Sequence, residues 1–165
     1  MTCNGCNELL EVINSPGGLR NVPDRYAFVD SLTEVEGCIG NGLAVCAAAE
    51  DWSRFEQYVF VATQHPDRRY VPILCSVLHR QLFDVSSDDI VTALGEIADP
   101  RSVPFLVEAM WWDLDWDEYQ QLAKKCVWAL ARIGTPDALE ALRDAASVGS
   151  DILREEAQYE LNRRS

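Results

Sequence analysis

Apolar residues recur at helical spacing through the second half of the chain. Leu94 and Ile97 lie three positions apart, and Leu130 and Ile133 repeat this spacing 36 residues later. Side chains three or four positions apart share one face of an α-helix, so this pattern predicts amphipathic helices. Small residues such as Ala93 on the same stretches favour close approach between neighbouring helices.

The two stretches belong to an internal repeat. Residues 93–106 read Ala-Leu-Gly-Glu-Ile-Ala-Asp-Pro-Arg-Ser-Val-Pro-Phe-Leu, and residues 129–142 read Ala-Leu-Ala-Arg-Ile-Gly-Thr-Pro-Asp-Ala-Leu-Glu-Ala-Leu. In each copy a capping residue, Asp99 or Thr135, precedes a proline, which suits the first turn of a second helix. Each copy therefore predicts two helices joined by a short turn, which bury their apolar faces by stacking on the next copy.

Fainter copies flank this pair. Upstream, residues 58–62 predict a first helix, 65–67 a turn and 71–78 a second helix. Downstream, residues 153–161 match a first helix again. This last helix has no second helix after it, so we expect it to cap the stack.

The repeated pattern Ala-Leu-x-x-Ile-Gly/Ala-Thr/Asp-Pro-x-Ala/Ser-Leu/Val-x-x-Leu resembles the HEAT repeats of the phycobilisome-lyase-like type. The match is good over residues 88–146, weak over 52–82 and absent before that. The resemblance implies an all-α fold, an α-solenoid of helical hairpins with a binding surface. Function varies widely among such proteins, so the resemblance alone names no partner.

We expect a single domain over residues 1–165, with an irregular N-terminal helical cap over 1–51 and HEAT-like repeats over 52–165. Within the cap, the pattern predicts short helices over 7–13 and 23–36. Gly37 to Gly42 predict a break, because glycine disfavours helix, and a further helix begins within Leu43 to Ala49.

The net charge of −13 limits the kinds of partner that we expect the protein to bind. An acidic surface repels phosphate groups, so we expect no nucleic-acid binding and no binding to anionic membranes. Ten carboxylates lie between Asp84 and Glu118, with Arg101 as their only basic neighbour. Such charge serves solubility or attracts a basic protein partner. The chain shows neither an export signal nor a bilayer-length apolar run, so we expect a cytoplasmic protein.

The candidate partner-binding segment joins the two clearest repeats and interleaves aromatic rings with carboxylates. Its residues are Trp111, Trp112, Asp113, Asp115, Trp116, Asp117 and Glu118. Tryptophan is enriched among the residues that dominate binding energy, and carboxylates steer basic partners. The alternative is structural: the rings tuck between repeats, while the carboxylates stay solvated or cap the next helix. A calcium loop is disfavoured, because Glu118 and Lys124 stand where glycine and glutamate are required.

Six cysteines are spaced irregularly, at positions 3, 6, 38, 46, 75 and 126. Without an export signal we expect reduced thiols, with Cys46, Cys75 and Cys126 as small core residues. A structural zinc site needs four ligands, and we expect no metal and no cofactor. The alternative is zinc bound by the remaining cysteines together with one of the core thiols, namely Cys3, Cys6, Cys38 and Cys46.

No catalytic motif is present in the sequence, which carries only two histidines, His65 and His79, and no phosphate-binding loop. We therefore expect a protein-binding module and no enzyme. Small, acidic proteins built on helical repeats are similar to bacterial immunity proteins, which suggests an inhibitor that sequesters a basic toxin. The alternatives are a HEAT-like lyase or enzyme-accessory scaffold, and a structural component of a larger assembly.

Overall fold

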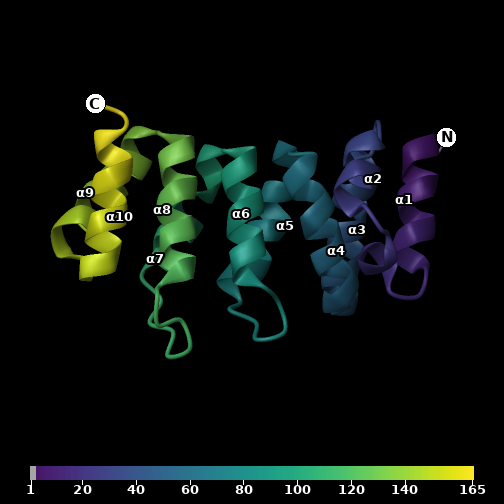
Figure 1. The fold of residues 1–165 in the computed structure, drawn as a ribbon, viewed down its shortest axis with the longest axis horizontal. Helices are drawn as coiled ribbons and strands as arrows, with labels where there is room; N and C mark the ends of the chain where they lie inside the picture. The colour runs from purple at the N-terminus through teal and green to yellow at the C-terminus, as the bar shows by residue number, and fades with distance from the viewer. Residues whose placement is uncertain (1–2) are drawn as a thin grey trace.

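Helices stacked side by side in chain order make up the protein (Figure 1). The computed structural model describes residues 3–165, and over that range it contains helices and no strands. This confirms the predicted all-α solenoid. None of the described helices is both long and apolar enough to cross a bilayer.

Ten α-helices and three short 3₁₀ turns occur in the described range. The α-helices are α1 (Asn4–Asn14), α2 (Arg25–Ser31), α3 (Glu36–Ala49), α4 (Trp52–Gln64), α5 (Val71–His79), α6 (Ser87–Ile97), α7 (Val103–Met110), α8 (Gln121–Ile133), α9 (Pro136–Val148) and α10 (Asp151–Asn162). The 3₁₀ turns are η1 (Gly18–Asn21), η2 (Arg68–Tyr70) and η3 (Pro100–Ser102).

The helical hairpins predicted from the repeat are present as α4–α5, α6–α7 and α8–α9. The first helices contact one another in the order α4, α6, α8 and α10, while α3, α5, α7 and α9 contact one another in a second layer. Helix α10 packs on α8 and α9 and ends the stack, as predicted. Where α6 meets α8, a Cβ on Gly95 would lie 2.4 Å from the Trp128 ring, so the close approach requires glycine.

The two edges of the solenoid differ. The turns within hairpins are short and lie together along one edge (Figure 1). There the Thr135 hydroxyl accepts a hydrogen bond from the Ala138 amide at 3.4 Å, which confirms the predicted cap of α9. The longer connections between hairpins, residues 80–86 and 111–120, lie along the opposite edge (Figure 1).

The predicted break at Gly37 to Gly42 is wrong, because α3 runs unbroken through these glycines. Packing explains why: a Cβ on Gly42 would lie 2.2 Å from the Tyr58 ring of α4. The glycine therefore allows α3 and α4 to approach closely, and tertiary contacts outweigh its low helix propensity. The helix predicted over 23–36 is correct only for α2, because the chain becomes extended at Leu32.

The expectation that all cysteines are reduced is also wrong. Cys6 and Cys38 form a disulfide that joins α1 to the start of α3, with their Cα atoms 5.9 Å apart. A Cβ on Gly5 would lie 2.5 Å from the Thr33 carbonyl oxygen, so glycine lets α1 approach this segment closely enough to pair the thiols. Cys46, Cys75 and Cys126 are free and buried, as predicted.

Candidate functional site

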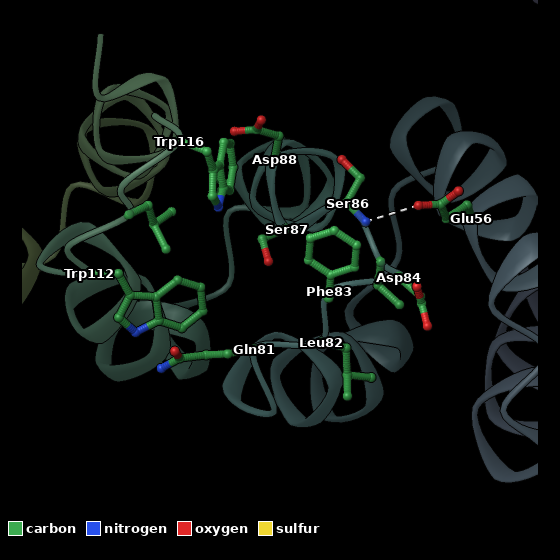
Figure 2. Close-up of a pocket in the computed structure, with 12 residues that line it drawn as sticks. Glu56, Gln81, Leu82, Phe83, Asp84, Ser86, Ser87, Asp88, Trp112 and Trp116 are labelled. Carbon is green, nitrogen blue, oxygen red and sulfur yellow. Dashed lines mark hydrogen bonds between the residues drawn. The ribbon is translucent and has the colours of Figure 1, made fainter. Parts of the chain in front are cut away.

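A groove of about 550 Å³ lies where the connections 80–86 and 111–120 meet. Phe83 comes from the first connection, and Trp112, Leu114 and Trp116 come from the second. In the view of Figure 2 the two tryptophans lie at one end, with Phe83 between them and the carboxylates of Asp84 and Glu56. The groove is therefore built from the two connections together with side chains of α4 and α6.

At the start of the connection 111–120, over residues 111–115, alternate residues face the core. Trp112 and Leu114 are half-buried and pack against the hydrophobic core, whereas Trp111 and Trp116 are 43% and 69% exposed. The backbone amide of Asp117 donates to the Leu114 carbonyl at 2.9 Å, which closes a turn in this connection. The chain thus presents Trp116 to solvent from an anchored turn.

The connection 80–86 is held at both of its ends, and at the first the Gln81 amide donates to the Leu78 carbonyl at 3.1 Å. Val85 is buried, and the Ser86 hydroxyl caps α6 by accepting a hydrogen bond from the Asp89 amide at 3.3 Å. The Ser86 amide donates to the Glu56 carboxylate of α4 at 2.9 Å (Figure 2). Between these anchors the side chain of Phe83 is 97% exposed. A phenylalanine so fully exposed on a fixed backbone is a candidate anchor for another molecule.

Two polar groups of the groove lack a hydrogen-bonding partner among the described residues. They are the indole nitrogen of Trp112 and the Oδ1 oxygen of Asp88, both of which are buried. Burial raises the pKa of the Asp88 carboxyl, and the Lys125 ammonium, 3.9 Å from Oδ1, opposes that rise. Buried polar atoms are normally satisfied, so these two, which neighbouring protein atoms cover, are exceptions among the polar groups of the groove.

The predicted binding segment divides into residues inside and outside the groove. Trp112 and Trp116 line it, whereas Trp111 lines a smaller neighbouring pocket. Asp113, Asp115 and Glu118 are exposed to solvent.

Asp117 has a structural role in the same segment. Its carboxylate accepts hydrogen bonds from the amides of Gln121 at 2.8 Å and Leu122 at 3.0 Å, and so caps α8. For Asp117, the structural alternative given in the sequence analysis, in which a carboxylate caps the next helix, is therefore correct.

Sequence reasoning missed the other wall of the groove. Phe83 was not singled out, and Glu56, Asp84 and Asp88 entered at most as part of a charge count. The sequence did contain a signal for Phe83. This phenylalanine lies in the connection Gln81-Leu82-Phe83-Asp84, outside the helical pattern, so no apolar helix face is available to bury its ring. That Phe83 and Trp116 line the same groove, however, depends on how the hairpins stack.

The family model of HEAT repeats matches residues 71–162, which is more than half of the chain. The chain belongs to the HEAT-repeat family. The matched range runs from α5 to α10 and extends beyond the residues 88–146 in which the pattern was clearest. HEAT repeats generally mediate protein–protein interaction, so a protein-binding role follows from the family. No curated protein matches the chain.

Proposed function

We propose that this protein binds a basic protein through the groove between connections 80–86 and 111–120, and acts as an inhibitor of the immunity type. On this proposal it performs no reaction of its own. It sequesters its partner by covering a basic, functional surface of that partner.

The observation that carries the proposal is the group of exposed aromatic rings, Phe83 and Trp116, on either side of a groove with acidic walls. Exposed rings of this size lose their contact with water when a partner covers them, and aromatic residues dominate the energetics of interfaces. Both rings stand on anchored backbone, so little conformational entropy is lost when they are covered.

Charge supports a basic partner. Asp84, Asp88 and Glu56 line the groove, and Asp113 and Asp115 lie exposed on the same connection as Trp116. An arginine or lysine side chain entering the groove would lie among these carboxylates and would supply charge-assisted donors to them. Its cationic head would also lie close to tryptophan rings, whose faces attract cations.

The immunity-type role rests on size, charge and chemistry together. The chain has 165 residues, a net charge of −13 and no catalytic motif in its sequence. A small acidic module of this kind suits the blocking of a basic enzyme, because opposite charge accelerates encounter.

The test compares the protein with two variants as baits in its native cells. Phe83→Ala with Trp116→Ala removes the exposed rings of the groove, while Tyr159→Ala removes an exposed ring on α10 and serves as the matched control. Each bait is used at low and at moderate salt, and the proteins recovered are identified and quantified. We expect a stoichiometric basic protein with the wild type and the control, but not with the groove variant.

The recovered partner is then purified and assayed alone and with one equivalent of this protein. Loss of the partner's toxic or enzymatic activity supports the immunity-type role. A partner whose activity is unchanged supports binding only and directs attention to a scaffold. Equal recovery by the wild type and the groove variant would remove the groove from the proposal.

A further inference from the structure

Three cysteine sulfur atoms come together at the N-terminal end of the solenoid. The Sγ atoms of Cys3, Cys6 and Cys38 all lie within 4.8 Å of one another. Cys3 caps α1, Cys6 lies in its first turn, and Cys38 lies in the first turn of α3. Cys6 and Cys38 form the disulfide, whereas the thiol of Cys3 is free and half-buried.

Backbone groups of two segments contact the cluster. Cys3 stands at the N-terminus of α1, where a helix carries partial positive charge, and its thiol donates to the Glu34 carbonyl oxygen at 3.0 Å. The Cys6 amide donates a hydrogen bond to the Cys3 sulfur at 3.4 Å. Metal ions bind cysteine as thiolate, so a cation at this cluster would take the place of the Cys3 proton and of its hydrogen bond to Glu34, while the bond from the Cys6 amide can remain.

The spacing of the sulfur atoms fits a thiolate-bound metal. With zinc–sulfur bonds of about 2.3 Å, two thiolates at a tetrahedral ion lie about 3.8 Å apart. The Cys3 sulfur lies within 4.8 Å of both disulfide sulfurs, and once the disulfide is reduced, rotation about the cysteine side chains can bring all three sulfurs to this separation. Cys3 and Cys6 also have the two-residue spacing that is common among zinc ligands.

The fourth cysteine considered from the sequence lies too far away. Cys46 follows Cys38 by eight residues on α3, and a rise of about 1.5 Å per residue separates them by about 12 Å. Three protein ligands are therefore present, which leaves the fourth position of a tetrahedral ion to water or a small external ligand.

We infer that the reduced protein binds a thiophilic cation, with Zn²⁺ as the representative, through Cys3, Cys6 and Cys38. The disulfide is the oxidised form of the same site. A thiol or phosphine reductant supplies two electrons, the sulfur–sulfur bond breaks, and Cys6 and Cys38 each take up a proton. The cation then displaces the protons of the three thiols to solvent and forms three metal–sulfur bonds.

The first experiment needs no mutation. The wild-type protein is reduced with a phosphine, freed of it under anaerobic conditions and titrated with Co²⁺, while the oxidised protein is titrated in parallel. We expect one equivalent of Co²⁺ to produce sulfur-to-cobalt charge-transfer absorption and tetrahedral visible bands in the reduced protein alone. Zn²⁺ should then abolish both signals by displacing the cobalt.

The variant Cys3→Ser sharpens the test, because serine is also a good helix N-cap and leaves the disulfide pair intact. We expect its affinity for Zn²⁺ to fall by more than about 100-fold, since even indirect support of a metal ligand is worth about 10- to 100-fold. Cys46→Ala, which removes a buried thiol outside the cluster, should bind as the wild type does.

Far-ultraviolet circular dichroism of every variant checks that the helices persist. A reduced, helical wild type that shows no cobalt–thiolate absorption would overturn the inference. Binding by Cys3→Ser as tight as that of the wild type would overturn it as well, because the site would then not include the third sulfur.

Discussion

At the scale of single residues, Asp99 is the most constrained charge in the protein. It is buried, and its carboxylate accepts hydrogen bonds from Arg68 at 2.7 Å and from the Arg101 guanidinium at 2.9 and 3.0 Å. Hydrogen bonds from Arg101 and Arg68 hold the pKa of this carboxyl well below its ordinary value. Because Arg68 belongs to the preceding hairpin, this one carboxylate joins two repeats.

We expect Asp99→Asn to lower the free energy of unfolding by about 2–3 kcal/mol at neutral pH, because it leaves charged donors without an ionised acceptor. A carboxyl with a lowered pKa stabilises the folded state above its unfolded pKa of about 3.9, and this contribution is lost as the pH falls further. The difference between wild type and variant in urea denaturation should therefore shrink below about pH 4.

Asp67 provides the matched control for this prediction. It precedes η2 as Asp99 precedes η3, but it is half-buried and bonds only to Arg69. Asp67→Asn should lower the stability by about 1 kcal/mol or less. Equal losses at both positions would contradict the bridging role of Asp99.

The raised pKa of Asp88 leads to a prediction of how pH affects binding of the proposed partner. Burial raises the pKa of this carboxyl, and a partner's cation binds only the ionised form. Affinity should therefore be constant near neutral pH and fall as the pH drops through this pKa, which lies above the ordinary value of an aspartate carboxyl. Calorimetric titration of the partner between about pH 8 and about pH 4 measures this dependence.

The variant Asp88→Asn should bind the partner more weakly, by about 1–2 kcal/mol, and should lose the part of the pH dependence that lies at higher pH. Asp89→Asn removes an exposed carboxylate beside it and should retain wild-type behaviour. An unaltered pH profile in Asp88→Asn would show that the partner's cation binds elsewhere.

At the scale of elements, α6 and α8 end in the same way with different residues. The residue after each helix has a positive φ, which is 53° for Ala98 and 65° for Gly134. Glycine adopts this conformation without steric penalty, whereas other residues lose about 1–2 kcal/mol. We expect Ala98→Gly to raise the free energy of unfolding by up to about 1 kcal/mol and Gly134→Ala to lower it by about the same amount.

Thermal denaturation of the two variants measures both changes. The pair controls for helix position, because the two residues occupy equivalent sites in successive hairpins. Changes of the same sign in both variants would contradict this account.

Helical elements could be predicted from the sequence wherever apolar residues and caps agree. Leu130, Ile133 and the pair Thr135–Pro136 mark the end of α8 and the start of α9 within a residue or two. The prediction failed in α3, because the local signal of Gly42 opposes helix while its role is to accommodate the Tyr58 ring from another helix. A contact with a residue of another helix gives no signal in the local pattern of apolar residues.

At the scale of the whole molecule, the distribution of charge leads to a prediction about association rate. Asp113 and Asp115 are exposed beside the groove, whereas Glu140 and Asp144 are exposed on α9. We expect Asp113→Lys with Asp115→Lys to slow association with the proposed basic partner by about tenfold at low salt. Asp117 is left unchanged, since it caps α8.

The double variant Glu140→Lys with Asp144→Lys changes the net charge by the same amount and serves as the control. Stopped-flow measurements over a range of salt concentrations separate the two cases. If both double variants slow association equally, net charge and not the groove governs encounter, and the proposed position of the interface would be wrong.

The disulfide predicts unequal stability along the solenoid. It closes a loop with a sequence separation of 32, for which a chain-entropy estimate gives about 3–4 kcal/mol. Repeat proteins open locally, so reduction in the presence of a chelator should destabilise mainly α1 to α3. Hydrogen exchange should speed up in these helices and stay unchanged in α6 and α8; uniform acceleration would contradict this.

Contacts between residues that lie far apart in the sequence were the hardest feature to predict. The tryptophans of residues 111–116 could be singled out by composition, but their neighbour Phe83 lies in the previous connection. The meeting of Cys6 with Cys38 likewise depends on the packing of α1 against the segment before α3. Both contacts arise from tertiary packing, which the periodicity of one helix does not encode.

The placement of the groove on two connections separates recognition from folding. Phe83 and Trp116 contribute to the groove while the buried faces of α6 and α8 hold the stack together. Substitutions at the exposed positions of residues 80–86 and 111–120 therefore alter the recognised surface at little cost to the scaffold, provided that the capping residues Ser86 and Asp117 are kept. The same helices could therefore carry different binding specificities, which would be set by the exposed side chains of two short segments.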